Sequence, residues 1–297
     1  MQSWSDSSVC LGLDMGATSM RASVVGPGGR IVESTRCSLP EGRAARVQLP
    51  IDIARGYLDR IDAVGLAVAG TVTAGRLTWT ANLGIADIDY AAEFRSQLGL
   101  PAVVLNDARA AGIAEAATGA GVGARTLLAL TIGTGIGGAL LVDGKLVEGT
   151  GQAGEVGHLV IDRSGLECGC GKCGCWETVV GGRALARVAA SLYPLAEQPM
   201  DALLEAAAEG EPAAVETIDR VQDCFRDGVD NLAAILAPDV IVLGGGMMAR
   251  NNLLSQAYLN LEGLRWFEGH VARSTLGDLA GQLGAAFAAH ALLHEPA

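Results

Sequence analysis

Aromatic and charged residues are both scarce in this chain of 297 residues. It contains four each of Phe, Tyr and Trp, and 18% of its residues are charged, against about 25% in average proteins. A disordered chain needs low hydrophobicity and high charge, so the apolar share of 50% excludes that class. No run of about 18 residues is free of charges and turn residues, which argues against a membrane span.

Clusters of basic residues and an export signal are also missing. The chain has 21 basic and 33 acidic residues, a net charge of −12, and this surface repels phosphate backbones and anionic lipid. We therefore expect neither nucleic acid nor a membrane as partner. The first ten residues have no basic segment followed by an apolar one, so we expect a cytoplasmic protein. Thiols stay reduced in the cytoplasm, where clustered cysteines bind metal more often than they form disulfides.

Glycine, in contrast, is abundant, with 41 residues or roughly 14% of the chain, about twice ordinary usage. Three glycine-bearing turns follow apolar segments that read as strands, at residues 14–18, 133–138 and 244–246. Each could be no more than a tight or crowded turn. The middle one lacks the Gly-Lys-Ser/Thr ending of a P-loop and joins two strands, unlike a Rossmann turn.

The order of apolar segments predicts an α/β protein with two related halves. Residues 9–13, 20–25 and 31–38 read as an antiparallel meander, and a second strand, glycine turn and strand begin at residue 126. Further strands are expected at 63–69, 103–105 and 239–243. Helices are expected at 51–59, from 107 to about 118, over most of 181–236, and at 281–293 as an amphipathic helix. Three glycine turns in this order indicate a nucleoside triphosphate bound between the halves, since backbone N–H groups reach phosphates where side chains are absent.

Asn106 and Asp107 stand at the end of a predicted strand, directly before a predicted helix. Asp107 could accept a proton from a substrate hydroxyl. Alternatively, it could only cap the helix.

The densest chemical signal runs from Glu155 to Glu177. His158 is followed, ten residues later, by four cysteines within eight residues: Cys168, Cys170, Cys173 and Cys175. Thiolate and imidazole are the ligands that tetrahedral zinc prefers, and a site filled by four protein ligands is structural. Five candidates compete for four places, so one of them is spare. Glu155 and Glu177 could accept hydrogen bonds from sugar hydroxyls, or could be a surface charge and a helix-start carboxylate respectively.

Together these residues resemble the ROK family of bacterial sugar kinases and repressors, in the actin-like ATPase superfamily. The resemblance spans nearly the whole chain, and its most specific part is Glu155–His158 with Cys168–Glu177. It implies the two-domain actin-like (ribonuclease H-like) fold, with a cleft between the domains and a zinc-bound loop. Residues 1–110, joined by the C-terminal helix at about 281–297, would form the small domain, and residues 111–280 the large one.

The resemblance also implies roles for individual residues. Zinc would be held by His158, Cys168, Cys170 and Cys175, which leaves Cys173 spare. Asp107 would be the general base that activates the 6-hydroxyl of a sugar. Sugar contacts would come from Asn82, Asn106, Asp107, Glu155, His158 and Glu177. ATP would be bound by Asp14, Gly16 and Thr18, by Thr131, Gly133, Thr134 and Gly135, and by Gly244, Gly245 and Gly246, with Mg²⁺ on its phosphates.

Several positions depart from the family pattern. Met15, Ala17 and Ser19 change the first loop, Arg109 replaces an asparagine, Ala69-Gly70-Thr71 replaces Pro-Gly-Pro, and Trp176 replaces an aliphatic residue. Most of them surround the sugar positions and bear on substrate identity. The expected activity is that of a glucokinase, with an amino-sugar kinase (N-acylmannosamine, glucosamine or 3-amino-glucose) as the alternative. A sugar-sensing repressor is a remote alternative, because only eight residues precede the first strand. Family members commonly dimerise, so a homodimer or a dimer of dimers is expected.

Overall fold

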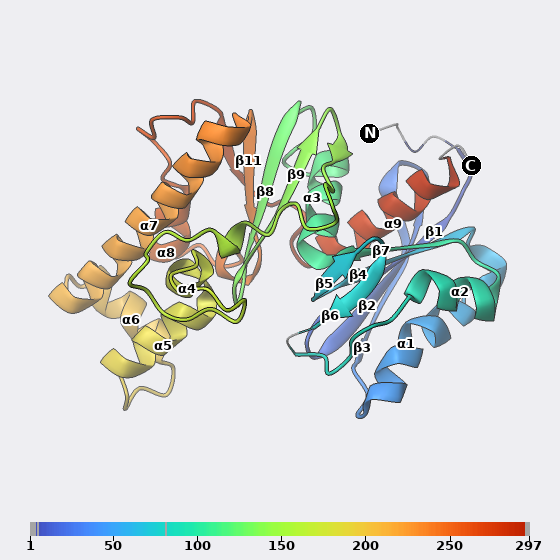
Figure 1. The fold of residues 1–297 in the computed structure, drawn as a ribbon, viewed down its shortest axis with the longest axis horizontal. Coiled ribbons are helices and arrows are strands. Elements are labelled where there is room, and N and C mark those ends of the chain that lie inside the picture. Colours follow the sequence, from blue (N-terminus) through green and yellow to red (C-terminus); the bar gives the residue numbers. More distant parts are fainter. Residues whose placement is uncertain (1–3, 5, 81, 295–297) are drawn as a thin grey trace. The chain divides into compact units, whose positions relative to one another are not determined.

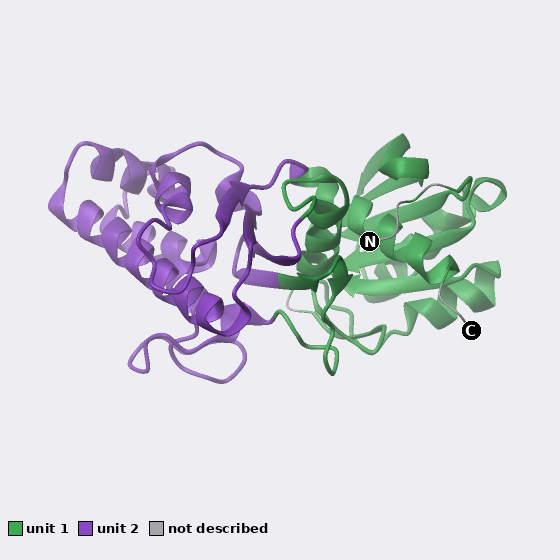
Figure 2. Cartoon of the chain, turned by 90° about the horizontal axis from the view of Figure 1, so that it is seen from above, with its two compact units in different colours: residues 1–123, 139–154, 278–297 green, residues 124–138, 155–277 purple. Residues whose placement is uncertain are grey.

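The computed structural model describes residue 4, residues 6–80 and residues 82–294. Two compact units divide the chain (Figure 2). The first comprises residues 1–123, 139–154 and 278–297, and the second comprises residues 124–138 and 155–277. No helix in the described ranges is both long and apolar enough to cross a membrane.

The first unit is built on a five-stranded sheet that begins with the predicted meander (Figure 1). Its strand order is β3 (Arg30–Ser38), β2 (Ser19–Gly26), β1 (Cys10–Met15), β4 (Ala63–Val68) and β7 (Ala102–Asn106). β1, β2 and β3 pair antiparallel, whereas β1, β4 and β7 pair parallel. A two-stranded sheet of β5 (Thr71–Thr73) and β6 (Arg76–Trp79) lies outside it.

Alternating residues of β1 and β4 face different helices. Leu11 and Leu13 share a buried cluster with Ile51 of α1 (Arg43–Arg55) and Tyr90 of α2 (Tyr90–Leu98). On the other face lies α9 (Ala280–Leu293), which also packs against α3 (Asp107–Thr118) (Figure 1).

Glycine allows α9 to approach this sheet closely. A Cβ placed on Gly12 would lie 1.9 Å from the carbonyl oxygen of Gln282, and one on Gly65 would lie 1.9 Å from that of Ala285. Some of the abundant glycines therefore allow a helix to pack closely on the sheet, in addition to those in the three turns expected to bind a nucleotide.

A second five-stranded sheet repeats the strand order of the first. Its order is β10 (Lys145–Leu146), β9 (Ile136–Val142), β8 (Thr126–Ile132), β11 (Val240–Gly244) and β12 (His270–Arg273). The residues that form β10 are grouped with the first unit, and the rest of this sheet except part of β9 with the second. β8, β11 and β12 pair parallel, as β1, β4 and β7 do. The predicted pair of related halves is thus present in the topology. The division between the units passes through β9.

Five helices accompany this sheet: α4 (Glu177–Val180), α5 (Gly182–Leu192), α6 (Pro199–Ala208), α7 (Pro212–Leu236) and α8 (Leu253–Leu259). Alternate residues of β8 and β11, such as Leu130 and Ile241, share one core cluster with Phe225 of α7 and Tyr258 of α8. The sheet positions the glycine turns, and these helices fill one of its faces.

Two of three expectations about helices are wrong in detail. The helix expected at 51–59 starts at Arg43 and ends at Arg55, with Pro50 inside it, although proline favours the first turn. The expected helical stretch 181–236 is confirmed, and three helices, α5, α6 and α7, cover most of it. The last helix is buried over most of its surface and so is not amphipathic, because β1 and β4 cover one side and α3 another.

Candidate active site and metal centre

The candidate residues of the first unit gather at one edge of its sheet. Because β1, β4 and β7 run parallel, their carboxyl ends lie together, the usual place for ligands in such sheets. Asp14 is in register with Ala67 of β4, which is in register with Leu105 of β7. Asp14 and the Asn106-Asp107 pair therefore belong to the same edge.

Asp14 is a largely buried carboxylate. Its partner is Arg21, whose Nη1 lies 3.4 Å from Oδ2. Burial raises the pKa of Asp14 above the usual carboxyl value, and the Arg21 guanidinium opposes this shift only in part. Close packing keeps the carboxylate in place, since a Cβ on Gly281 of α9 would lie 2.7 Å from its Cγ.

The first glycine turn is a tight hairpin between β1 and β2. The N–H of Gly16 donates to the carbonyl of Ser19 over 3.0 Å. Ala17 and Thr18 are exposed at the tip. Ala17 is not among the described residues with positive φ, so its methyl group causes no backbone strain where the family pattern has glycine.

Asn106 is the residue that caps α3. Its Oδ1 accepts from the N–H of Ala108 at 2.9 Å and of Arg109 at 3.3 Å, while its Nδ2 donates to the carbonyl of Gly70 at 3.1 Å. Asp107 is the first residue of the helix, and its Oδ1 accepts from the N–H of its neighbour Ala108 at 3.0 Å. The capping role that competed for Asp107 is thus filled by Asn106.

The two glycine loops of the second unit lie side by side. Thr131 at the end of β8 is in register with Gly244 at the end of β11. Gly245 has φ of 89°, and a Cβ there would lie 2.5 Å from the carbonyl oxygen of Ile132, so only glycine fits. A Cβ on Gly246 would meet open space.

The start of α5 holds the second loop in place. Its first two N–H groups, of Gly182 and Arg183, donate to the carbonyls of Gly133 and Thr134 at 2.8 and 2.9 Å. Gly135 lies against Glu177, because a Cβ there would be 2.2 Å from Oε2 of that residue. The loop expected to bind phosphate is thus packed directly on a residue expected to bind sugar.

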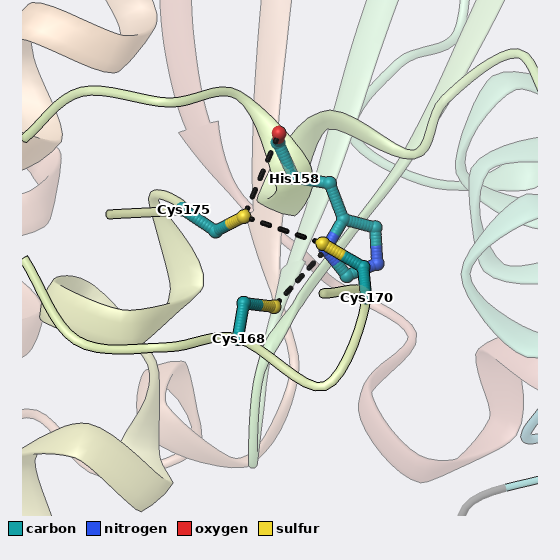
Figure 3. Close-up of side chains that lie close together, drawn as sticks. All are labelled: His158, Cys168, Cys170 and Cys175. Carbon is teal, nitrogen blue, oxygen red and sulfur yellow. Dashed lines mark hydrogen bonds between the residues drawn. The ribbon is translucent and has the colours of Figure 1, made fainter. Parts of the chain in front are cut away.

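Four of the five candidate metal ligands converge, as Figure 3 shows. The ligand atoms of His158, Cys168, Cys170 and Cys175 lie within 4.8 Å of one another. Cys173 is exposed and outside this group.

The spacing of these atoms fits a tetrahedral zinc ion. Sγ of Cys168 lies 3.5 Å from Nδ1 of His158, and Sγ of Cys170 lies 3.5 Å from Sγ of Cys175. Zn–S and Zn–N bonds of about 2.3 and 2.0 Å place tetrahedral ligands roughly 3.5–3.8 Å apart. Burial raises the pKa of Cys168 to about 12, so a cation is needed to keep it as a thiolate.

The two carboxylates expected to bind sugar flank this cluster. Oε2 of Glu155 lies 3.8 Å from Nε2 of His158, and Oε1 of Glu177 lies 3.7 Å from its Nδ1. Oε1 of Glu177 also accepts from Sγ of Cys168 at 3.1 Å. His158 thus turns Nδ1 toward the thiols and Nε2 toward Glu155. Asn82 is exposed in the segment between β6 and α2.

Trp176 has a structural role that the sequence did not reveal. It is fully buried, donates from Nε1 to the carbonyl of Cys224 at 2.9 Å, and stacks on Phe225 at 5.4 Å. Gly228 makes room for its ring, since a Cβ there would lie 2.2 Å from Cε2. Trp176 therefore fixes Cys175 and Glu177, its neighbours in the chain, to α7.

Comparison with known proteins gives consistent matches along the chain. The glucokinase of Streptomyces coelicolor is 31% identical over 304 residues, covering 93% of this chain and 96% of that protein. The N-acetylmannosamine kinase of Yersinia pestis bv. Antiqua is 32% identical over 244 residues, covering 80% of this chain and 82% of that protein.

A solved structure agrees with these matches. The ROK family glucokinase from Streptomyces griseus, in complex with glucose and AMPPNP, is 32% identical and superposes with a TM-score of 0.78 over 95% of this chain and 99% of that one. These relatives support a sugar kinase. The model of the ROK family matches residues 10–291, and the chain belongs to that family.

Proposed function

We propose that this protein is an ATP-dependent kinase that phosphorylates the 6-hydroxyl of a hexose, with glucose as substrate. The observation that carries the proposal is the near full-length match to the glucokinase solved with glucose and AMPPNP. A second support is that Asp14 and Asn106 in the first unit, and Thr131 and Gly244 in the second, lie at or near the carboxyl ends of parallel strands.

Asp107 acts as the general base. It is fixed at the first turn of α3 by the Asn106 cap, and its carboxylate accepts the proton of the sugar hydroxyl. The hydroxyl oxygen then attacks the γ-phosphorus of ATP, the bond to the β-phosphate oxygen breaks, and ADP leaves with that electron pair. The products are the sugar phosphate, ADP and a proton held on Asp107.

Glycine loops in both units bind the nucleotide. Backbone N–H groups at Gly16 and Gly133 to Gly135, with the hydroxyls of Thr18, Thr131 and Thr134, donate to phosphate oxygens. Gly244 to Gly246 bind the adenosine, because the flat adenine ring can lie close against a backbone that carries no side chains. Mg²⁺, bound with ATP, neutralises charge on the phosphates, and Asp14 offers the kind of oxygen ligand that this ion prefers.

Glu155, His158 and Glu177 bind sugar hydroxyls together with Asn82, Asn106 and Asp107. Zinc held by His158, Cys168, Cys170 and Cys175 supplies no chemistry to the reaction but fixes the loop. With these four residues as ligands, no position would remain for an activated water. Nδ1 of His158, which lies beside Sγ of Cys168, would be the ligand atom, and Nε2 would remain for the sugar.

An amino-sugar kinase is the second candidate, favoured by the similarity to N-acetylmannosamine kinase. A coupled assay of ADP release across glucose, mannose, glucosamine, 3-amino-glucose and N-acetylmannosamine separates the two. We expect the highest kcat/KM with glucose, and phosphorus–carbon coupling in the NMR spectrum of the product at C6. Turnover of N-acetylmannosamine without turnover of glucose would replace the first candidate by the second. Polyphosphate in place of ATP tests the donor.

Asp107→Asn tests the assigned base. The amide keeps the shape but accepts no proton, so we expect kcat to fall by about 10²–10⁴-fold while KM for ATP changes little. Asp89→Asn is the matched control, because Asp89 is an exposed carboxylate at the start of another helix, α2, and is not among the proposed site residues. Full activity in Asp107→Asn would remove Asp107 from the mechanism.

A further inference from the structure

Two of the chain's four histidines lie one helical turn apart at the end of α9. His290 is in the last turn of the helix and His294 is its C-terminal cap. Residues i and i+4 share one face of a helix, which is the spacing that places two imidazoles on one metal ion. This pair lies in the first unit and has no part in the sugar or nucleotide site proposed above.

Both imidazoles converge on the same carboxylate oxygen from the other end of the chain. Oδ2 of Asp6 lies 3.0 Å from Nε2 of His290 and 2.6 Å from Nε2 of His294. These three residues are the second group in the described ranges whose ligand atoms lie within 4.8 Å of one another, besides the cysteine cluster.

Surrounding contacts fix two of the three side chains. His290 is 7% exposed, and the Trp4 ring stacks on it at 4.5 Å with an interplanar angle of 20°. Oδ1 of Asp6 accepts from the N–H of Ser8 at 2.9 Å and from its hydroxyl, which leaves Oδ2 directed at the histidines. Trp4 also donates to the carbonyl of Ser8 at 3.2 Å.

We propose that Asp6, His290 and His294 form a second metal site, which binds a divalent first-row cation of the zinc type. Imidazole nitrogen and carboxylate oxygen suit Zn²⁺ and Co²⁺, whereas Mg²⁺ prefers oxygen ligands alone and does not compete. Tetrahedral ligands about 2.0 Å from the ion lie roughly 3.3 Å apart. The observed separations of 3.0 and 2.6 Å therefore have to widen by about 0.3 Å at His290 and about 0.7 Å at His294.

The site is open to solvent on one side. The side chains of His294 and Asp6 are 43% and 39% exposed, so the ion enters there and keeps a water molecule as fourth ligand. An exchangeable ion is expected, in contrast to the four-ligand cysteine site.

Binding joins the two ends of the chain. Asp6 and His290 are 284 residues apart, so the ion closes a very long loop. Because the ion binds only the folded state, the Tm of the protein rises as the concentration of the ion increases. Asp6, with Ser8 bound to it, becomes fixed to α9.

The experiment compares the Zn²⁺ stoichiometry of the wild type, Asp6→Asn, His294→Ala and the control His270→Ala, each dialysed against a mild chelator and titrated calorimetrically. His270 is exposed and lies on β12, outside the cluster. Whatever the cysteine cluster binds is common to all four proteins. We expect the first two variants to bind one equivalent less than the wild type and the control, and to lose the rise in Tm with added Zn²⁺.

Fluorescence provides a second readout at the site itself. Co²⁺ bound next to the stacked indole quenches Trp4, and Co²⁺ in the cysteine cluster would quench Trp176 as well. Quenching of Trp4 is therefore taken as the difference between each protein and its Trp4→Phe counterpart. This difference is expected to be saturable in the wild type and absent in His294→Ala. Equal stoichiometry in all four proteins, or quenching of Trp4 that survives in His294→Ala, overturns the proposal.

Discussion

Arg109 donates from Nη2 to the carbonyl of Gly151 over 2.7 Å and from Nε to the carbonyl of Ala153 over 3.2 Å. The arginine is 5% exposed and stands on the first turn of α3, two residues after Asp107. Its acceptors lie in a segment where Gly149, Gly151 and Gly154 all have positive φ. This segment leads directly to Glu155, so an arginine at a position where the family pattern has asparagine fixes the residues that precede a proposed sugar-binding residue.

Arg109→Ala is therefore expected to weaken both stability and sugar binding. Two carbonyls lose a charged donor, which lowers the free energy of unfolding by about 1–3 kcal/mol. KM for sugar should rise more than KM for ATP, because the disturbed segment precedes Glu155. Thermal unfolding and steady-state kinetics measure the two effects. Arg95→Ala, at an exposed position of α2, is the control, and an equal effect in both variants contradicts the positioning role.

Gly65→Ala is expected to destabilise the first unit by about 1–3 kcal/mol or more, since overpacking displaces neighbours. The added methyl would lie 1.9 Å from the carbonyl oxygen of Ala285, and backbone cannot yield as a flexible side chain can. Gly26→Ala is the control in the same sheet, because its methyl meets only Val32 at 3.8 Å. Denaturant unfolding should show a lower midpoint in Gly65→Ala and an unchanged or higher one in Gly26→Ala.

Local patterns predicted much of this fold. Apolar alternation and glycine turns, which are patterns between residues close together in the chain, predicted the first hairpin and the repeated half. The position of the last helix was predicted in the same way. The hairpin of β5 and β6 was missed although Ala74 and Gly75, both with positive φ, form its turn. Burial of the last helix could not be foreseen, because it depends on α3 and on β1, which lies about 270 residues away in the chain.

The candidate site divides in the same way. The cysteine cluster was evident because its ligands lie within 18 residues, from His158 to Cys175. The partners of Trp176 and Arg109 lie 48 and 42 residues away, so no local spacing reveals them. The sequence left open whether Asp107 only caps α3, and the hydrogen bonds give the capping role to Asn106 instead.

Loss of the proposed zinc should disturb sugar binding before it disturbs nucleotide binding. Cys168→Ser removes one of the four proposed zinc ligands, so the loop that carries Glu155, His158 and Glu177 is no longer held by the metal. We expect no tightly held zinc, a lower Tm and a KM for sugar raised at least tenfold. Elemental analysis after dialysis against a mild chelator measures the metal. Cys173→Ser is the matched control, since Cys173 is exposed and outside the cluster. Stoichiometric zinc in Cys168→Ser contradicts the assigned ligand set.

Asp14→Asn should stabilise the folded chain at neutral pH while it abolishes activity. Burial raises the pKa of Asp14 in the folded state above its unfolded value, so ionisation of this group opposes folding. The folded state binds more protons between the two pKa values, and its stability falls as the pH rises through the raised pKa. The amide imitates the neutral carboxyl, and Arg21 keeps its second partner Asp278 at 2.8 Å.

Melting curves from pH 4 to pH 8 test this expectation. The difference in Tm between Asp14→Asn and the wild type should be positive at pH 8 and should shrink as the pH falls through the raised pKa, where the wild-type carboxyl becomes protonated. Asp278→Asn is the control, because this partner of Arg21 is 83% exposed. A lower Tm for Asp14→Asn at every pH would instead show that the ion pair with Arg21 outweighs the burial of Asp14.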